Sequence, residues 1–137
     1  MAFTDNLRRQ HREILILVEE ITEALKSNPS LIEQISDLLP KLAGKINIHL
    51  AMEDNALYPK LLASDEVKVR QTAADFLNEM GNLKETFRAY LKQWNSVIKI
   101  NDHYDQFRLD TQTIFTALTQ RIAREDRELY DLADKRV

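Results

Sequence analysis

Apolar residues recur every three or four positions through four long stretches of the chain, and this period constrains the fold more than any other feature. A spacing of three and four places side chains on one face of an α-helix, whereas a strand needs a spacing of two. Only two glycines and three prolines occur among 137 residues, so few positions favour turns. The sequence therefore predicts an all-α protein whose helices each bury one face.

The first two predicted helices are separated by the polar stretch SNPS at positions 27–30. Thr4 precedes the first periodic stretch and is expected to cap its helix. In the second stretch the apolar positions continue past Pro40 and Gly44. We expect this helix to bend or break there, because proline has no amide hydrogen to donate.

Ser64 is expected to cap the third predicted helix, which is long and continues to the polar break at 101–105. The fourth helix runs from this break nearly to the C-terminus. Because short connections make consecutive helices neighbours, we expect an antiparallel up-down-up-down four-helix bundle. The length fits a single domain that covers residues 1–137.

Charge and cysteine content argue against several classes of function. The chain has 19 lysines and arginines mixed with 22 aspartates and glutamates, so no basic surface for nucleic acid is expected. It has no cysteine, which excludes disulfides and thiolate chemistry and fits a reducing compartment. The N-terminal apolar run is too short for a signal peptide or a membrane span. We therefore expect a cytoplasmic protein that binds neither nucleic acid nor membranes.

Five polar residues occupy apolar-face positions where a simple bundle would place leucine. They are two histidines, two glutamates and an arginine: His11, His49, Glu53, Arg121 and Glu125. Burying such groups costs free energy unless they are paired or bound to a metal. His49 and Glu53 lie one helical turn apart, so a ring nitrogen and a carboxylate oxygen can reach the same ion. The distances of all five residues from the predicted turns place them in one layer.

Two segments repeat one pattern, HLAMEDNALYPKL at 49–61 and RIAREDRELYDLA at 121–133. Aligned without a gap, they share alanine, glutamate, aspartate, leucine and tyrosine at matching positions. The first copy begins with a histidine and the second with an arginine. Tyr58 and Tyr130, the shared tyrosines, are expected to pack at the end of the bundle with hydroxyls in water, or else to bond to the polar layer. His103 falls in a polar break and is expected to be exposed.

Three segments resemble the hemerythrin-like proteins, which contain the HHE cation-binding domain: QHREIL, HLAMEDNALYP and REDRELYDLA. The resemblance covers essentially the whole chain. It implies a four-helix bundle with a non-heme di-iron site, held by histidines of all four helices and by two bridging carboxylates. It also implies that the protein binds oxygen, or senses oxygen, nitric oxide or iron. His11 and His49 correspond to histidine ligands of one iron, and Glu53 and Glu125 correspond to the bridging carboxylates.

The sequence departs from this family where the second iron should be held. Met80 stands where the third helix should supply a histidine, and Lys84 lies one turn further on. Arg121 replaces the histidine of the fourth helix. Met80 is expected to pack in the vacated volume. We therefore expect one ion at most.

Two interpretations of this half-site stay open. In the first, two histidines and two glutamates hold one divalent ion, which is non-heme iron or else zinc or manganese. Arg121 then supplies the positive charge of the missing ion. In the second interpretation no metal binds, and Arg121 pairs with Glu53 and Glu125 in a buried salt-bridge cluster.

Three functions fit these interpretations. The chain is a metal-binding module that senses or stores a small diatomic ligand, a metal-free interaction or regulatory protein, or a redox enzyme with a mononuclear iron. The sequence contains no nucleophile paired with a base and no phosphate-binding glycine loop, which favours a binding protein over an enzyme. Self-association into a homo-oligomer stays open.

Overall fold

The computed structural model describes residues 2–27 and 31–136, and these two ranges contain helices and no strand. Four long helices make up most of them: α1 (Asp5–Ser27), α2 (Ile32–Met52), α4 (Val67–Gln93) and α6 (Tyr104–Arg124). The shorter elements are α3 (Tyr58–Leu62), α5 (Val97–Asp102), α7 (Tyr130–Arg136) and two π-helical segments, Glu53–Leu57 and Glu125–Leu129. The prediction of an all-α protein is confirmed.

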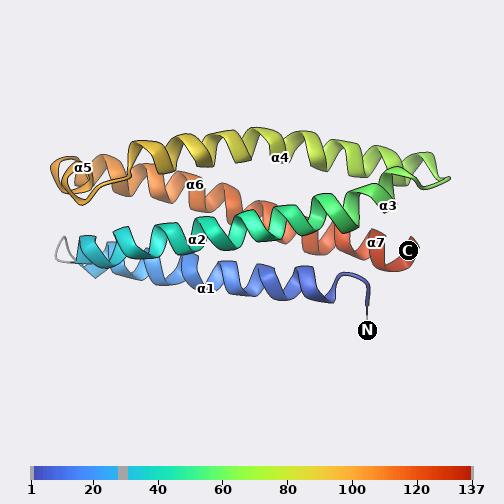
Figure 1. Cartoon of the computed structure of the whole chain (residues 1–137), viewed down its shortest axis with the longest axis horizontal. Helices are drawn as coiled ribbons and strands as arrows, with labels where there is room; N and C mark the ends of the chain where they lie inside the picture. Colours follow the sequence, from blue (N-terminus) through green and yellow to red (C-terminus); the bar gives the residue numbers. More distant parts are fainter. Residues whose placement is uncertain (1, 28–30, 137) are drawn as a thin grey trace.

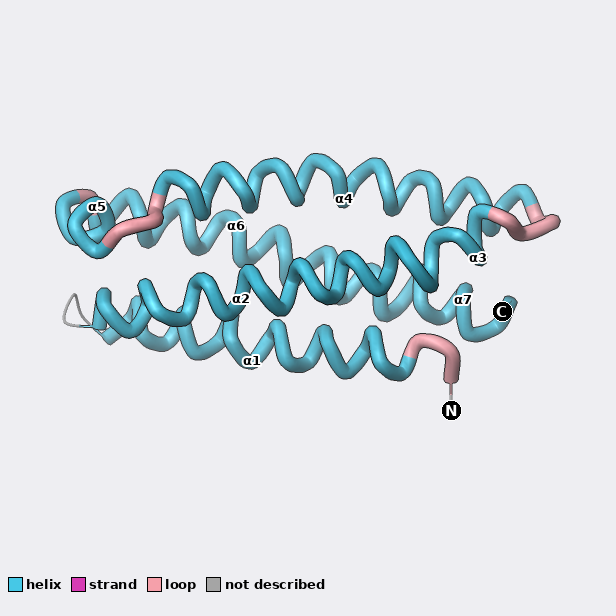
Figure 2. The backbone as a smooth tube through the Cα atoms, in the orientation of Figure 1, coloured by secondary structure: helices cyan, strands magenta, loops and turns pink. Residues whose placement is uncertain are grey.

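The long helices lie side by side along the molecule (Figure 1). α1 packs against α2 and α6, and α6 also packs against α4. The described loops gather at the ends of the molecule (Figure 2). Part of the predicted polar break between the first two helices, positions 28–30, lies outside the described residues. This arrangement places one face of each long helix toward the interior.

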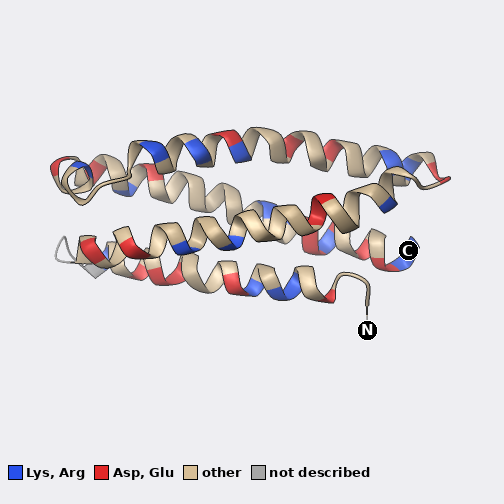
Figure 3. Cartoon of the chain, in the orientation of Figure 1, with Lys and Arg blue, Asp and Glu red and all other residues tan. Residues whose placement is uncertain are grey.

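Charged residues of both signs are spread over the long helices (Figure 3). Each described helix is too short or too polar to cross a membrane. The buried surface therefore lies between the helices, where the apolar faces meet.

The predicted break at Pro40 and Gly44 is absent. α2 continues through both residues to Met52. Pro40 is exposed, so its ring lies on the solvent side of the helix, where water can reach the backbone that loses a hydrogen bond. The α-helical hydrogen-bonding pattern is lost later, in the π-helical segment Glu53–Leu57.

The third predicted helix ends earlier than expected. α4 stops at Gln93, and a separate helix, α5, fills the space before the break at 101–105. The Ser96 hydroxyl accepts a hydrogen bond from the amide of Lys99 at 3.2 Å, so Ser96 caps the new helix. The two polar residues that precede α5, Asn95 and Ser96, thus separate it from α4. His103 lies between α5 and α6 and is exposed, as expected.

The two predicted cap residues have other partners. Thr4 directly precedes α1, and its hydroxyl donates to Asp134 of α7 at 2.9 Å. This bond attaches the start of the chain to its last helix. Ser64 is not the cap of α4, because Glu66 occupies that position. The Ser64 hydroxyl instead accepts the amide of Glu66 within the preceding turn, at 3.2 Å.

Buried apolar residues form two clusters on either side of the predicted polar layer. The larger cluster includes Ile14 of α1 and Leu50 of α2, and the smaller one includes Leu7 of α1 and Leu57. His11 lies between the two α1 positions, and His49 borders Leu50 on α2. The polar layer therefore interrupts the core toward the end that holds α3 and α7.

Leu42 is fully buried in the larger cluster, so truncating its side chain tests this core. Leu42→Ala is expected to lower the free energy of unfolding by about 2–5 kcal/mol, because it removes buried methyl groups and leaves a cavity. Chemical denaturation would measure the loss. Ile48→Ala, at an exposed position on the same helix, is the control and should change stability by less than about 0.5 kcal/mol. Equal losses in the two variants would contradict the assigned core.

Candidate metal centre

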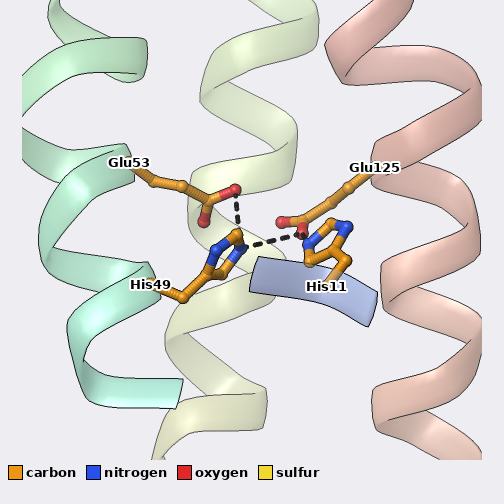
Figure 4. Close-up of side chains that lie close together, drawn as sticks. All are labelled: His11, His49, Glu53 and Glu125. Carbon is orange, nitrogen blue, oxygen red and sulfur yellow. Dashed lines mark hydrogen bonds and ion pairs between the residues drawn. The ribbon is translucent and has the colours of Figure 1, made fainter. Parts of the chain in front are cut away.

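Four buried side chains meet between the helices (Figure 4). They are His11, His49, Glu53 and Glu125, and each offers one ligand atom. These four atoms all lie within 4.8 Å of one another. The structure thus brings together the four residues that the sequence suggested as metal ligands.

The two glutamates occupy equivalent places in the repeated segments. Glu53 and Glu125 are each the first residue of a π-helical segment. In each copy the carbonyl of the glutamate accepts a hydrogen bond from the amide of the tyrosine five residues later. A π-turn contains more residues than an α-turn, so it rotates the residues that follow it. The rotation directs both tyrosines, Tyr58 and Tyr130, inward.

Outer hydrogen bonds orient the two histidine rings. Nδ1 of His11 lies 2.8 Å from a carboxylate oxygen of Asp126. Nδ1 of His49 lies 2.7 Å from the amide oxygen of Gln10. Each ring is therefore held through its outer nitrogen, and Nε2 is left to face the interior. Nε2 of His11 lies 2.9 Å from Glu125 Oε1, and Nε2 of His49 lies 3.4 Å from Glu53 Oε2.

The hydroxyl of Tyr130 occupies the middle of this group. It lies 3.1 Å from Nε2 of both His11 and His49, and it donates to Glu53 Oε2 at 2.5 Å. The Tyr130 ring stacks on His11 with centroids 5.0 Å apart, and the Arg8 guanidinium lies 5.5 Å from the ring centroid. Burial, together with the nearby carboxylates, raises the pKa of Tyr130 well above its usual range. The expectation that the Tyr130 hydroxyl lies in water is wrong. The alternative expectation, a hydrogen bond to the polar layer, is confirmed.

Arg121 is buried beside Glu125. Its Nε donates to Glu125 Oε2 at 3.0 Å, and its Nη2 donates to the Tyr58 hydroxyl at 3.2 Å. Nη1 lies 3.6 Å from Glu79, and the guanidinium lies 4.7 Å from the centroid of the Phe76 ring. The Tyr58 hydroxyl is thus buried and bonded, rather than in water as expected.

The carboxylates and the histidines shift the pKa values of each other. Burial lowers the pKa of His49, but the hydrogen bonds to Glu125 and Glu53 outweigh it, and the pKa rises to about 9. Burial raises the pKa of Glu125, but the bonds from His11 and His49 and the charge of Arg121 lower it to about 2. The site therefore favours positive charge at its centre.

Met80 is not a member of this group of candidate ligands. Its side chain is buried in the larger apolar cluster, where it packs as expected. Lys84, one turn later, is exposed. His103, the third histidine of the chain, is exposed at the far end of α6. The candidate metal group in the described residues is thus the set of two histidines and two glutamates.

Sequence reasoning missed two residues that organise the site, Gln10 and Asp126, and left the role of Tyr130 open. Gln10 and Asp126 hold the outer nitrogens of the histidines, and Tyr130 joins the ligand atoms at the centre. Gln10 directly precedes His11 and Asp126 directly follows Glu125. This adjacency to candidate ligands was the sequence signal that could have identified them. Tyr130 follows Glu125 by five residues, a spacing that faces the site only in a π-turn.

The family model described as the Hemerythrin HHE cation binding domain matches residues 2–133. The chain belongs to this family. Members of the hemerythrin family bind metal, typically iron. No curated protein and no solved structure matches this HHE domain.

The residues of this HHE domain fit a metal ion by their chemistry. Two imidazole nitrogens and two carboxylates are donors that suit iron, zinc or manganese. The outer hydrogen bonds on both rings are those typical of histidines that ligate metals. Glu53 Oε1 is buried and has no hydrogen-bond partner, although buried carboxylate oxygens nearly always have one. His11, His49, Glu53 and Glu125 could therefore hold one divalent ion.

Tyr130→Phe is expected to lower the free energy of unfolding of the metal-free protein by about 1–3 kcal/mol, because Glu53 Oε2 loses its donor. Adding Zn²⁺ should then raise the melting temperature of the variant by more than that of the unsubstituted protein. The reason is that the hydroxyl no longer fills the point between the ligand atoms. Differential scanning calorimetry would measure both effects.

Tyr104→Phe is the matched control for this experiment. It removes a tyrosine hydroxyl that donates to the carbonyl of Leu25 at 3.0 Å, away from the site. Its response to Zn²⁺ should equal that of the unsubstituted protein. A smaller response in Tyr130→Phe than in the control would show that the hydroxyl assists the ion instead of competing with it.

Proposed function

We propose that this HHE domain is an up-down-up-down four-helix bundle that binds one divalent, non-heme metal ion of the iron type. His11, His49, Glu53 and Glu125 are the ligands. The observation that carries the proposal is the orientation of the two rings. Nε2 of both rings faces Glu125 Oε1, at 2.9 Å from His11 and 3.9 Å from His49, while Nδ1 is held from outside, so the donors are already in place before an ion arrives.

A second ion is not part of the proposal. Met80 and Arg121 stand where further histidines would be needed, and Arg121 already bonds to Glu125 Oε2. The guanidinium supplies a fixed positive charge beside that carboxylate, so Glu125 stays ionised without bridging two metals. The site is therefore mononuclear.

The protein surroundings support binding of a small ligand more than catalysis of a reaction. A bound ion would supply a Lewis-acidic centre that can bind an exogenous diatomic ligand, as in oxygen or nitric oxide sensing. Tyr130 donates to Glu53 and Arg121 donates to Glu125, so each carboxylate keeps one oxygen fixed by the protein. The apolar clusters on both sides limit the access of bulk water to the ligand atoms.

Metal content per chain tests the proposal directly. The untagged protein would be purified without chelator, reconstituted anaerobically with Fe²⁺ and analysed by elemental mass spectrometry. About one ion per chain is expected. Two ions per chain would contradict the mononuclear site, and no ion would contradict metal binding altogether.

A metal-free function is the second candidate, and one observation favours it. The ring nitrogens of His11 and His49 all have partners in the protein, and Arg121 neutralises Glu125. In that case the polar layer only holds the bundle together, and the domain acts through an interaction or regulatory surface. Failure to bind iron, zinc or manganese would select this function.

A further inference from the structure

A cavity of about 130 Å³ lies beside the candidate metal centre. Glu53, which is fully buried, lines its inner end. Gly81 and Lys84 of α4, which also line it, are exposed. Because one cavity is lined by both kinds of residue, it spans the distance between solvent and a candidate ligand.

One oxygen of Glu53, which lines this cavity, has no partner in the described part of the protein. Oε2 accepts the hydroxyl of Tyr130, whereas Oε1 is buried without a hydrogen-bond partner. An unpaired buried carboxylate oxygen costs free energy until it gains a partner. A cation that moves inward along the cavity would supply that partner.

We propose that this cavity is the entrance through which the divalent ion reaches the site, and that Glu53 Oε1 is the first ligand atom it meets. The inference rests on the proposed metal-binding function. Met80 lines the cavity wall, and its flexible unbranched side chain can change rotamer as the ion passes. Lys84 lines the exposed part, where its positive charge opposes the approach of a cation.

Gly81 lines the outer part of the cavity and has no side chain. A Cβ atom added at Gly81 would meet no heavy atom within 4 Å, so a larger residue can be introduced there without a clash. Gly44 is the other glycine of the chain and also has open space around an added Cβ. Both glycines are exposed and lie inside long helices, but Gly44 does not line this cavity. The two positions therefore form a matched pair.

The rate of Co²⁺ uptake tests the entrance. Metal-free protein would be mixed with Co²⁺ in a stopped-flow instrument, and the visible absorption of the bound ion would be followed. Gly81→Trp is expected to slow uptake at least about tenfold, because the indole fills the opening, whereas Gly44→Trp should leave the rate unchanged. The bound Co²⁺ at equilibrium should be the same in both variants, since neither changes a ligand.

Lys84→Gln provides a second, less disruptive test. Removing the charge is expected to speed uptake about two- to fivefold at low ionic strength, and the difference should vanish in high salt. An unchanged rate in Gly81→Trp, or equal slowing in Gly44→Trp, would overturn the entrance while leaving the metal site intact. Absence of bound Co²⁺ in the unsubstituted protein and in all variants would overturn the proposed function, and this inference with it.

Discussion

His49→Ala is expected to reduce bound metal from about one ion per chain to none. The substitution removes one of two imidazole donors, and Glu53 and Glu125 keep their charges without it. Loss of a residue that only orients a ligand weakens metal affinity about 10- to 100-fold, so loss of the ligand should weaken it by more. Elemental mass spectrometry after reconstitution and desalting would measure the metal that stays bound.

His103→Ala is the matched control for His49→Ala. It removes the exposed histidine between α5 and α6, far from the site, and should leave the metal content unchanged. Circular dichroism would show whether the His49 variant keeps its helical content, which separates loss of a ligand from loss of the fold. Unchanged metal content in a folded His49→Ala protein would refute the assignment of the site.

Arg121→Met should lower the free energy of unfolding of the metal-free protein by about 3–5 kcal/mol, because removing one partner of a buried ion pair leaves the other charge uncompensated. Glu125 is 2% exposed and would lose the Arg121 Nε donor. The buried Tyr58 hydroxyl would also lose the hydrogen bond that it accepts from Arg121. Denaturant unfolding would measure the change.

Metal addition makes the Arg121→Met experiment more specific. Zn²⁺ should restore part of the lost stability, because a bound cation neutralises Glu125 in place of the guanidinium. Arg88→Met is the control: it breaks an exposed pair with Glu85 at 3.5 Å and should cost less than about 1 kcal/mol. A loss of that small size in Arg121→Met would show that the buried pair does not stabilise the fold.

The helical class and the burial of the four candidate ligands were predictable because both depend on local spacing. The three-and-four period places His11, His49, Glu53 and Glu125 on the apolar faces of their helices, and all four are buried in the structure. The same period failed beyond Glu125. Leu132, two helical turns after Glu125, is partly exposed, whereas the fully buried residues are Leu129, Tyr130 and Ala133.

The helix ends were less predictable than the helices. Pro40 did not break α2, and Ser96 started an extra helix within a stretch expected to be continuous. Both outcomes depend on what surrounds the backbone. A carbonyl that faces water tolerates a missing donor, and a serine becomes a cap only when the chain turns at it. Sequence spacing carries neither kind of information.

By itself, the sequence determined that the chain is helical and that one polar layer, which includes Arg121, interrupts its apolar faces. The tertiary structure alone decided how that layer is connected. Tyr130 reaches both histidines and Glu53 because the π-turn rotates it inward and helices distant in sequence pack around it. Local spacing fixes which face of a helix a residue occupies, but contacts between helices depend on their packing, to which residues from the whole chain contribute.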